Sequence, residues 1–381
     1  MITAKRLDTV QEYYFSKKLR EVADLRAQGK PIINLGIGSP DLAPPPEVLE
    51  ALNNALSDNS AHQYQPYKGI KELRQAIAGF YDKYYSLQLN METEILPLMG
   101  SKEGIMHISL AFLNPGDEVL LPDPGYPTYS SVAKLVDAKE RNYKLNEENN
   151  WLPDLEKLEE SDLGRVKLMW VNYPHMPTGS RASEDFFEKL TRFAEKHKIL
   201  VVNDNPYSFI QNDKPQSILR KNGLSDYVME LNSLSKSFNM AGWRVGMLTG
   251  SEKNINSVLK VKSNMDSGMF YPVQAGAVEA LKLTGSWFER QNKIYSDRKK
   301  KVLEIAAELD CEVREDQVGL FIWAKVPEGK TSEEIVDDLL YRKDIFISPG
   351  FIFGSQGEGY VRFSLCADEG TIDEALKRIK T

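Results

Sequence analysis

The order of apolar and amphipathic segments between residues 46 and 280 most constrains the fold. Unbroken apolar runs recur there, each separated from the next by a helix-like segment, and the clearest are EVLLP near residue 120, VKLMWVN near 170, ILVVND near 202 and RVGMLTG near 247. Such runs are typical of strands buried on both faces, and their alternation with helices predicts a mostly parallel sheet covered by helices on both sides. We therefore predict an α/β fold with a large domain at 46–280.

The rest of the chain predicts a second, smaller domain. After the large domain, a long helical stretch leads into LFIWAKV, DIFISPG and YVRFSLC, which are typical of strands of an α+β domain at 281–381. Between Tyr14 and Leu25, apolar residues recur at helical spacing, which predicts an amphipathic helix. Residues 1–45 have no sheet of their own, so we expect them to join the smaller domain.

Charge and composition exclude several classes of protein. The formal net charge of -7 argues against a surface that neutralises nucleic-acid phosphates. No apolar run approaches about 18 residues, as a membrane helix requires, and the charged N-terminal stretch lacks the apolar core of a signal peptide. Two cysteines without redox or metal spacing fit a reducing compartment. We expect a cytoplasmic protein without a nucleic-acid or membrane partner, and we interpret the basic run Arg298–Lys301 as a solvated helix face.

Polar residues that carry chemistry follow the apolar runs. Asn172, Asp204 and the segment Ser233–Lys236 each come directly after one. In open α/β sheets, ligands bind beyond the carboxyl ends of the strands. We therefore expect these side chains to meet in one crevice.

The segment Asn232–Gly246, NSLSKSFNMAGWRVG, is the most informative motif. It places the amine of Lys236 between Ser235 and Ser237, and it adds the guanidinium of Arg244. A lysine amine forms an imine with an aldehyde, and a planar guanidinium binds phosphate through two parallel hydrogen bonds. The whole pattern predicts a site for a phosphorylated aldehyde, although an isolated Ser-Lys pair would be read as a polar surface loop.

With this motif the chain resembles the class I and II pyridoxal-phosphate-dependent aminotransferases of fold type I, the aspartate aminotransferase fold. The resemblance covers nearly the whole chain. It implies that pyridoxal 5'-phosphate is the cofactor and that Lys236 holds it as a Schiff base and carries the catalytic proton. It also implies that Ser233 and Arg244 bind the cofactor phosphate and that Ser235 contributes to the same site.

Further residues match the family's cofactor site. Gly100, Ser101 and Lys102 resemble the helix start that binds the phosphate, where backbone N-H groups and the helix dipole attract an anion. Seen alone, Ser101 would equally be an ordinary helix cap.

Residues after two other apolar runs match the groups around the cofactor ring. Asp204 resembles the catalytic carboxylate that pairs with the pyridine nitrogen, and Tyr207 the residue that donates to the phenolic oxygen. Asn172 is a further contact, and Tyr126 resembles the aromatic that stacks on the ring. Without Lys236, an acid that caps a turn and an aromatic that covers the core would be the preferred interpretations.

Met176 departs from the family pattern. Where the family reads Asn-Pro-Thr-Gly, this chain has Met176-Pro-Thr-Gly, so a thioether replaces an amide that donates to the phenolic oxygen. We expect Met176 to lie at the cofactor and to change the tuning of the imine, with Tyr207 left as the evident donor.

Substrate and subunit contacts are implied by three more matches. Arg362 in YVRFS resembles the arginine that binds the substrate α-carboxylate, and Gly38 in GIGSPD the glycine beside it. Gly36 and Gly38 could suggest a dinucleotide loop, but no third glycine opens a helix there. Tyr64 matches the tyrosine that reaches the neighbouring subunit's cofactor phosphate, which implies a homodimer with shared active sites.

We therefore predict transfer of an amino group between an amino acid and a 2-oxo acid. A C-S β-lyase of the same fold is the main alternative, because only the pocket separates the two outcomes. A cofactor-binding regulator attached to a DNA-binding domain is disfavoured, since the fold's signatures begin by residue 34.

Substrate identity stays open; Lys262 is a candidate for binding a second carboxylate, in a stretch that resembles the subgroup acting on alanine or diaminopimelate. None of the four histidines is expected to be a metal ligand.

Overall fold

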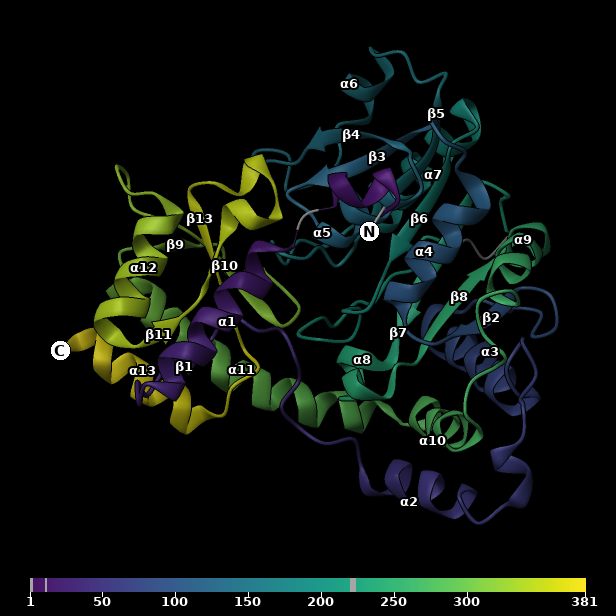
Figure 1. Cartoon of the computed structure of the whole chain (residues 1–381), viewed down its shortest axis with the longest axis horizontal. Coiled ribbons are helices and arrows are strands. Elements are labelled where there is room, and N and C mark those ends of the chain that lie inside the picture. The colour runs from purple at the N-terminus through teal and green to yellow at the C-terminus, as the bar shows by residue number, and fades with distance from the viewer. Residues whose placement is uncertain (1–2, 11, 220–223) are drawn as a thin grey trace.

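The computed structural model describes residues 3–10, 12–219 and 224–381, and within these ranges it has two lobes (Figure 1). One lobe is built on a seven-stranded sheet with the strand order β2-β8-β7-β6-β5-β3-β4. Its strands are β2 (Ile95–Leu98), β3 (Glu118–Asp123), β4 (Lys139–Lys144), β5 (Val166–Val171), β6 (Leu200–Asp204), β7 (Val228–Ser233) and β8 (Gly246–Gly250). This architecture confirms the predicted α/β class.

The strands from β4 to β7 are parallel, whereas β8 runs antiparallel to both β7 and β2. The run RVGMLTG is thus a strand as predicted, and of the seven strands it is the one that runs opposite to the others. Strand β4, with the sequence KERNYK, lies at the edge and is largely exposed. An exposed edge strand needs no unbroken apolar run, which is why the sequence pattern does not reveal it.

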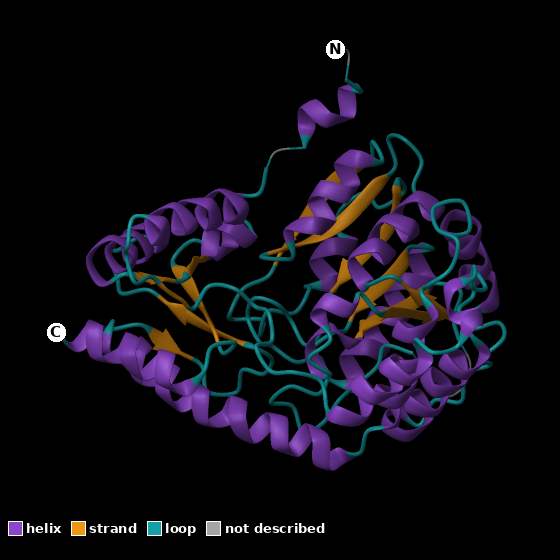
Figure 2. Ribbon diagram, turned by 60° about the horizontal axis from the view of Figure 1, so that its bottom comes forward, coloured by secondary structure: helices purple, strands orange, loops and turns teal. Residues whose placement is uncertain are grey.

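Helices cover both faces of this sheet (Figure 2). The helices of this lobe are α2 (Pro46–Ala55), α3 (Lys71–Tyr85), α4 (Ser101–Phe112), α5 (Pro127–Leu135), α6 (Leu155–Glu159), α7 (Glu184–His197), α8 (Leu234–Ser237), α9 (Glu252–Lys262) and α10 (Tyr271–Lys282). On β6, Leu200 and Val202 belong to the apolar cluster that includes Ile105 of α4, whereas Val201 belongs to the cluster that includes Leu190 of α7. Both sets of alternating side chains are therefore buried.

The second lobe combines the two ends of the chain (Figure 1). Its elements are α1 (Tyr14–Ala27), β1 (Ile33–Asn34), α11 (Gly285–Glu308), β9 (Glu312–Val313), β10 (Phe321–Lys325), α12 (Ser332–Lys343), β11 (Ile345–Phe346), β12 (Ser348–Pro349), β13 (Tyr360–Ser364) and α13 (Glu369–Lys380). Strand β1 pairs in parallel with β11, and β12, β13, β10 and β9 form a four-stranded sheet. We retain the division at residues 45 and 280 as a proposal, with α11 running from one lobe to the other.

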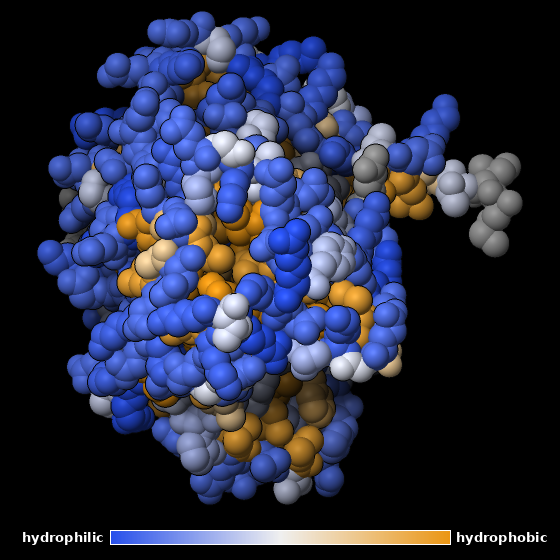
Figure 3. Space-filling view, turned by 90° about the vertical axis from the view of Figure 1, so that its left-hand side faces the viewer, coloured by the Kyte–Doolittle hydropathy of each residue, from blue (hydrophilic) through white to orange (hydrophobic). Residues whose placement is uncertain are grey.

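The described residues also form short 3-10 helices: η1 (Lys5–Thr9), η2 (Asn59–His62), η3 (Ala241–Trp243), η4 (Gly350–Phe353) and η5 (Ser355–Gly357). The predicted N-terminal amphipathic helix is confirmed as α1. Across the described ranges, no helix combines the length and the apolar character that a membrane crossing requires. The face of the second lobe is hydrophilic over most of its area, with apolar side chains visible between the polar ones (Figure 3).

The basic run on α11 is only partly solvated. Arg298 is 3% exposed and binds both carboxylate oxygens of Asp41, at 2.7 and 2.8 Å. Lys300 and Lys301 instead form ion pairs with aspartates on the surface. The prediction of a solvated face is therefore wrong for Arg298, because its partner Asp41 is remote in sequence.

Candidate active site

A cavity of about 400 Å³ lies at the carboxyl edge of the large sheet, where β10 and β13 of the second lobe approach it. Its lining residues come from both lobes: Gly38, Ser101, Lys102, Tyr126, Tyr129, Asn172, Met176, Asp204, Pro206, Tyr207, Ser233, Ser235, Lys236, Ala241, Arg244, Phe321 and Arg362. All of the predicted site residues are in this lining except Gly100 and Tyr64. Gly100 adjoins the cavity at the start of α4, and Tyr64 is 91% exposed on the surface.

Lys236 lies on α8, the single helical turn that follows β7. Ser233 caps this turn, since its Oγ accepts the backbone N-H of Ser235 at 3.1 Å. The Lys236 Nζ donates to the carbonyl of Gly38 at 2.5 Å. Burial lowers the pKa of Lys236, and the nearby charges of Arg362 and Arg244 lower it further. A larger fraction of this amine is therefore neutral and nucleophilic than in an exposed lysine.

Asp204 ends β6 and points one oxygen into the cavity region without a partner. Tyr129 donates its hydroxyl to Oδ2 at 2.9 Å, but Oδ1 is buried and has no hydrogen bond to a described residue. Burial raises the pKa of Asp204 to about 7. A cationic N-H donor at Oδ1 would satisfy this oxygen and restore the ionised form. Tyr129 is not among the predicted residues, although its position one turn after Tyr126 on α5 is a signal that could have found it.

Arg244 and the start of α4 form a compact anion site. A Cβ added at Gly100 would lie 2.1 Å from Arg244 Nη2, and one added at Gly246 would lie 2.6 Å from the backbone nitrogen of Ser101. Gly100 also has a φ of 97°, which favours glycine. These contacts bring a guanidinium beside backbone N-H groups at a helix start, an arrangement that suits a phosphate.

Arg362 of β13 is a buried cation between two aromatic rings. Its guanidinium lies 3.9 Å from the ring centroid of Phe321 and 4.6 Å from that of Phe353. Nη2 donates to the carbonyl of Gly36 at 2.9 Å, while Nε is buried without a partner. Burial lowers the pKa of Arg362 to about 10, so the group stays charged at neutral pH. No described residue supplies it with a carboxylate, which leaves it able to bind one from a substrate.

Met176 contacts both Arg362 and Asn172 in the cavity. Its Sδ lies 3.3 Å from Arg362 Nη1, and its backbone N-H donates to Asn172 Oδ1 at 2.9 Å. The side-chain nitrogen of Asn172 donates to the carbonyl of Asp204 at 2.5 Å. Asn172 therefore holds the backbone of two cavity segments in place as well as lining the cavity.

A second cavity of about 300 Å³ adjoins the first beside Lys102, Tyr126, Met176 and Arg362. Its other lining residues come mainly from the two ends of the chain: Tyr13, Tyr14, Phe15, Ser16, Pro127, Thr128, Ile352 and Phe353. This lining, in which five of twelve residues are aromatic, is not predicted from the sequence. It forms where Tyr13 and the start of α1 lie against α5 and η4, through the contacts of Tyr13 with Thr128 and of Tyr14 with Phe351.

Lys262, the predicted candidate for a second substrate carboxylate, is used elsewhere. It is 1% exposed, pairs with Asp266 at 2.8 Å and donates to the carbonyl of Tyr67 at 2.9 Å. It lines neither cavity. Its geometry therefore gives the proposed role no support.

The residues around the first cavity fit pyridoxal 5'-phosphate. A buried amine suits the aldehyde, the unpartnered oxygen of Asp204 suits a pyridine N-H, and the site at Arg244 suits the phosphate. The three groups line one cavity, so a single ligand can reach all of them.

Comparisons with known proteins agree with this chemistry. Residues 30–379 match the family described as aminotransferase class I and II. The chain is 39% identical to an LL-diaminopimelate aminotransferase of Dehalococcoides mccartyi over all of this chain and 98% of that protein, and 39% identical to one of Aquifex aeolicus over 98% and 97%.

Solved structures give the same result. BacF from Bacillus subtilis with substrate bound has a TM-score of 0.94 at 35% identity, covering 100% of this chain and 97% of that one. An aminotransferase from Staphylococcus aureus has a TM-score of 0.90 at 31% identity, covering 99% and 98%. These matches favour amino transfer over C-S cleavage. The chain belongs to the class I and II aminotransferases and is a pyridoxal-phosphate-dependent enzyme that transfers amino groups between amino acids and 2-oxo acids.

Proposed function

We propose that Lys236 binds pyridoxal 5'-phosphate through its amine and carries the proton of the reaction. When bound, the cofactor supplies an electron sink for the substrate Cα-H bond, which amino transfer requires. The lowered pKa of Lys236 favours the neutral amine that forms this bond. Once an incoming amino acid has displaced it, the same amine is placed to act as general base and then as general acid.

The other groups of the cavity position the reactants. Asp204 Oδ1 would accept the pyridine N-H, Tyr207 would donate to the ring oxygen, and Tyr126 would cover the ring. Arg244 and the start of α4, with Ser233, Ser235, Gly100 and Ser101, would hold the phosphate. Arg362 binds the α-carboxylate beside the backbone of Gly38.

One observation carries this assignment. The cavity that holds Lys236 contains two buried atoms without a partner, Asp204 Oδ1 and Arg362 Nε. The first prefers a cationic partner and the second an anionic one. Such groups are costly unless a ligand satisfies them. A pyridinium at one and a carboxylate at the other satisfy both.

For the substrate we propose LL-diaminopimelate, the compound in the names of the curated relatives. Its distal carboxylate requires a cation beyond the reacting centre. Lys102 lines both cavities, lies 5.5 Å from the ring centroid of Tyr13 and has no ion pair within the described residues. We therefore assign Lys102 to the distal carboxylate and not to the phosphate site that the family resemblance implies.

A large apolar amino acid is the second candidate. The adjoining cavity is lined by aromatic groups, among them Phe15 and Phe353, and no carboxylate side chain belongs to its described lining. A distal ammonium group would have only hydroxyl and carbonyl acceptors there.

A half-reaction screen separates the two candidates. The holoenzyme is mixed with LL-diaminopimelate, L-lysine, L-phenylalanine or L-methionine, and the change in cofactor absorbance is followed for each. If LL-diaminopimelate is the substrate, Lys102→Gln raises the KM for LL-diaminopimelate. The slow reaction with L-lysine stays unchanged, because L-lysine lacks the distal carboxylate. Lys134→Gln, a change to a nearby cation outside both cavities, is the matched control. A faster reaction with L-phenylalanine than with LL-diaminopimelate would favour the second candidate.

We also propose that two copies of the chain complete each other's active sites. Large apolar groups are exposed on neighbouring loops, with Tyr64 91%, Met265 61% and Phe270 47% exposed. Gly268 packs on this region, since a Cβ there would lie 2.3 Å from the carbonyl of Gln65. A partner that covers these groups would bring Tyr64 to the neighbouring phosphate site.

Light scattering and cofactor retention test the homodimer together. Tyr64→Phe is expected to speed cofactor loss during dialysis while the dimer mass is kept. Tyr341→Phe, which alters a tyrosine 50% exposed on α12, is the control and should have no effect. A fully active monomer would rule the proposal out.

A further inference from the structure

One buried histidine outside the cavities has no hydrogen-bond partner on either ring nitrogen. His107 of α4 is 1% exposed, and neither Nδ1 nor Nε2 has a hydrogen bond to a described residue. Glu103, one turn earlier on the same helix, places Oε1 at 3.4 Å from Nε2. The other carboxylate oxygen of Glu103 accepts the backbone N-H of Met99 at 3.0 Å, which fixes the orientation of the group.

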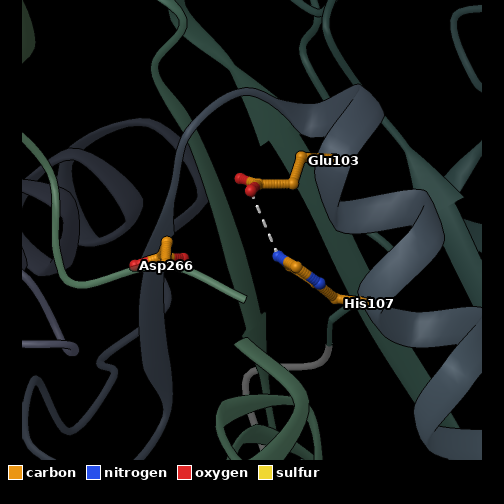
Figure 4. Close-up of side chains that lie close together, drawn as sticks. All are labelled: Glu103, His107 and Asp266. Atoms are coloured by element: carbon orange, nitrogen blue, oxygen red, sulfur yellow. Dashed lines mark ion pairs between the residues drawn. The ribbon is translucent and has the colours of Figure 1, made fainter. Parts of the chain in front are cut away.

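Asp266 brings a second carboxylate to this imidazole (Figure 4). Its side chain is 3% exposed, and its Oδ1 accepts from Lys262 and from the backbone of Gly268, each at 2.8 Å. Its Oδ2 is buried without a partner. One ligand atom from each of Glu103, His107 and Asp266 lies within 4.8 Å of the others.

We propose that Glu103, His107 and Asp266 form a binding site for a divalent first-row transition metal ion, with Zn²⁺ as the preferred ion. One imidazole nitrogen and two carboxylate oxygens are a ligand set that such ions accept. Metal-ligand distances of about 2.0 to 2.2 Å place the ligand atoms about 3.3 to 3.6 Å from one another, so these atoms, now within 4.8 Å, have to move closer when the ion binds. The sequence-based expectation of no metal ligand does not anticipate this site, because Asp266 is far from the helical pair in sequence.

Charge supports a cation at this point. With His107 neutral, Glu103 and Asp266 contribute two negative charges and Lys262 contributes one positive charge, which leaves one negative charge uncompensated. His107 and Asp266 are almost fully buried, whereas the side chain of Glu103 is 25% exposed, so a counter-charge at this point would lie against two desolvated groups. A metal ion supplies the counter-charge and also uses two of the three partnerless atoms, His107 Nε2 and Asp266 Oδ2.

The site has a structural place beside the cofactor cavity. Helix α4 begins at Ser101 and Lys102, which line that cavity, and Asp266 lies in the connection between α9 and α10. Lys262 extends the link to the carbonyl of Tyr67. A bound ion therefore fixes α4 against two loops without touching the reacting atoms.

Metal stoichiometry tests the proposal on the holoenzyme. The protein is dialysed against a chelator, then titrated with ZnCl₂ by calorimetry, and bound zinc is measured after gel filtration. We expect one ion per chain in the wild type and none at stoichiometric level in His107→Gln or Asp266→Asn. His197→Gln is the matched control, since His197 lies 2.9 Å from a single carboxylate, that of Glu159, and this variant should bind as the wild type does.

A spectroscopic measurement separates a metal from a proton on His107. Co²⁺ added to the chelated wild type should give visible d-d bands that His107→Gln lacks, and the Tm should rise with metal concentration only where the site is intact. A wild type that binds no stoichiometric Zn²⁺ or Co²⁺ would overturn the proposal. So would folded His107→Gln protein that binds the ion as tightly as the wild type.

Discussion

The cofactor-facing and substrate-facing halves of the cavity are built differently. The first is polar and rests on strand ends of the large sheet, with Lys236 and Arg244 supplied by one continuous motif. The second is rich in aromatic residues and is assembled mainly from the chain ends, through residues such as Tyr13 and Phe353. The cofactor chemistry is thus carried by residues of the large sheet. Substrate selection is carried by the chain-end segments that lie against it. Changes in the first half should affect all substrates, whereas changes in the second should affect them unequally.

Lys236→Ala should have the largest effect. Loss of the amine removes both the bond to the cofactor and the proton carrier, so turnover should fall by at least about 10⁴-fold with every amino acid. Circular dichroism and thermal unfolding should show a folded protein. Near-normal turnover in this variant would break the assignment of the cofactor half.

Asp204→Asn should rank second, with a loss of about 100-fold or more for all substrates, because a neutral amide stabilises a charged ring much less than a carboxylate does. Steady-state rates with two unrelated amino acids measure it. A loss confined to one of them would move Asp204 to the substrate half.

Asp204 also gives the cofactor-free enzyme a pH dependence. Its pKa is raised to about 7 in the folded protein, whereas an unfolded aspartate has a pKa of about 3.9. Between these values the folded state holds a proton that the unfolded chain has released, so rising pH favours unfolding by up to about 1.4 kcal/mol per pH unit. Urea unfolding at several pH values should show this slope in the wild type and a smaller one in Asp204→Asn. Equal slopes would show that Asp204 is not buried as described.

Arg362→Lys should lower kcat/KM by roughly 10- to 100-fold, since a point charge replaces a planar group held between Phe321 and Phe353. The main change should be in KM, with cofactor retention unchanged. Loss of the cofactor instead would show that Arg362 belongs to the cofactor-facing half of the cavity.

The cofactor half was largely predictable because its residues lie in short motifs at strand ends. Continuous apolar runs located the sheet, and the groups after them converge at one edge, as parallel strands require. Tyr129 was missed, although helical spacing from Tyr126 could have indicated it.

Pairings between distant segments could not be predicted in the same way. Asp41 binds Arg298, and Asp266 meets His107, but neither pair has a local pattern, since each depends on how separate elements pack. The aromatic cavity at Tyr13 has the same origin. From its residue types alone, the basic run predicted a solvated side chain for Arg298. Its partner Asp41, which is remote in sequence, makes that prediction wrong.

Met176 lies where the two halves meet, and its variant should have the smallest effect on turnover. A donor to the ring oxygen stabilises its anionic form, so Met176→Asn should lower the pKa of the Lys236 imine by about 1 to 2 units, corresponding to about 1.5 to 3 kcal/mol. A spectral pH titration measures it, with Met176→Leu as the apolar control. The short contact between Met176 Sδ and Arg362 Nη1 provides the competing outcome, because the new amide oxygen could accept from the guanidinium instead. An unchanged imine pKa together with an altered KM would place Met176 in the substrate half, whereas a lowered pKa with an unchanged KM would place it in the cofactor half.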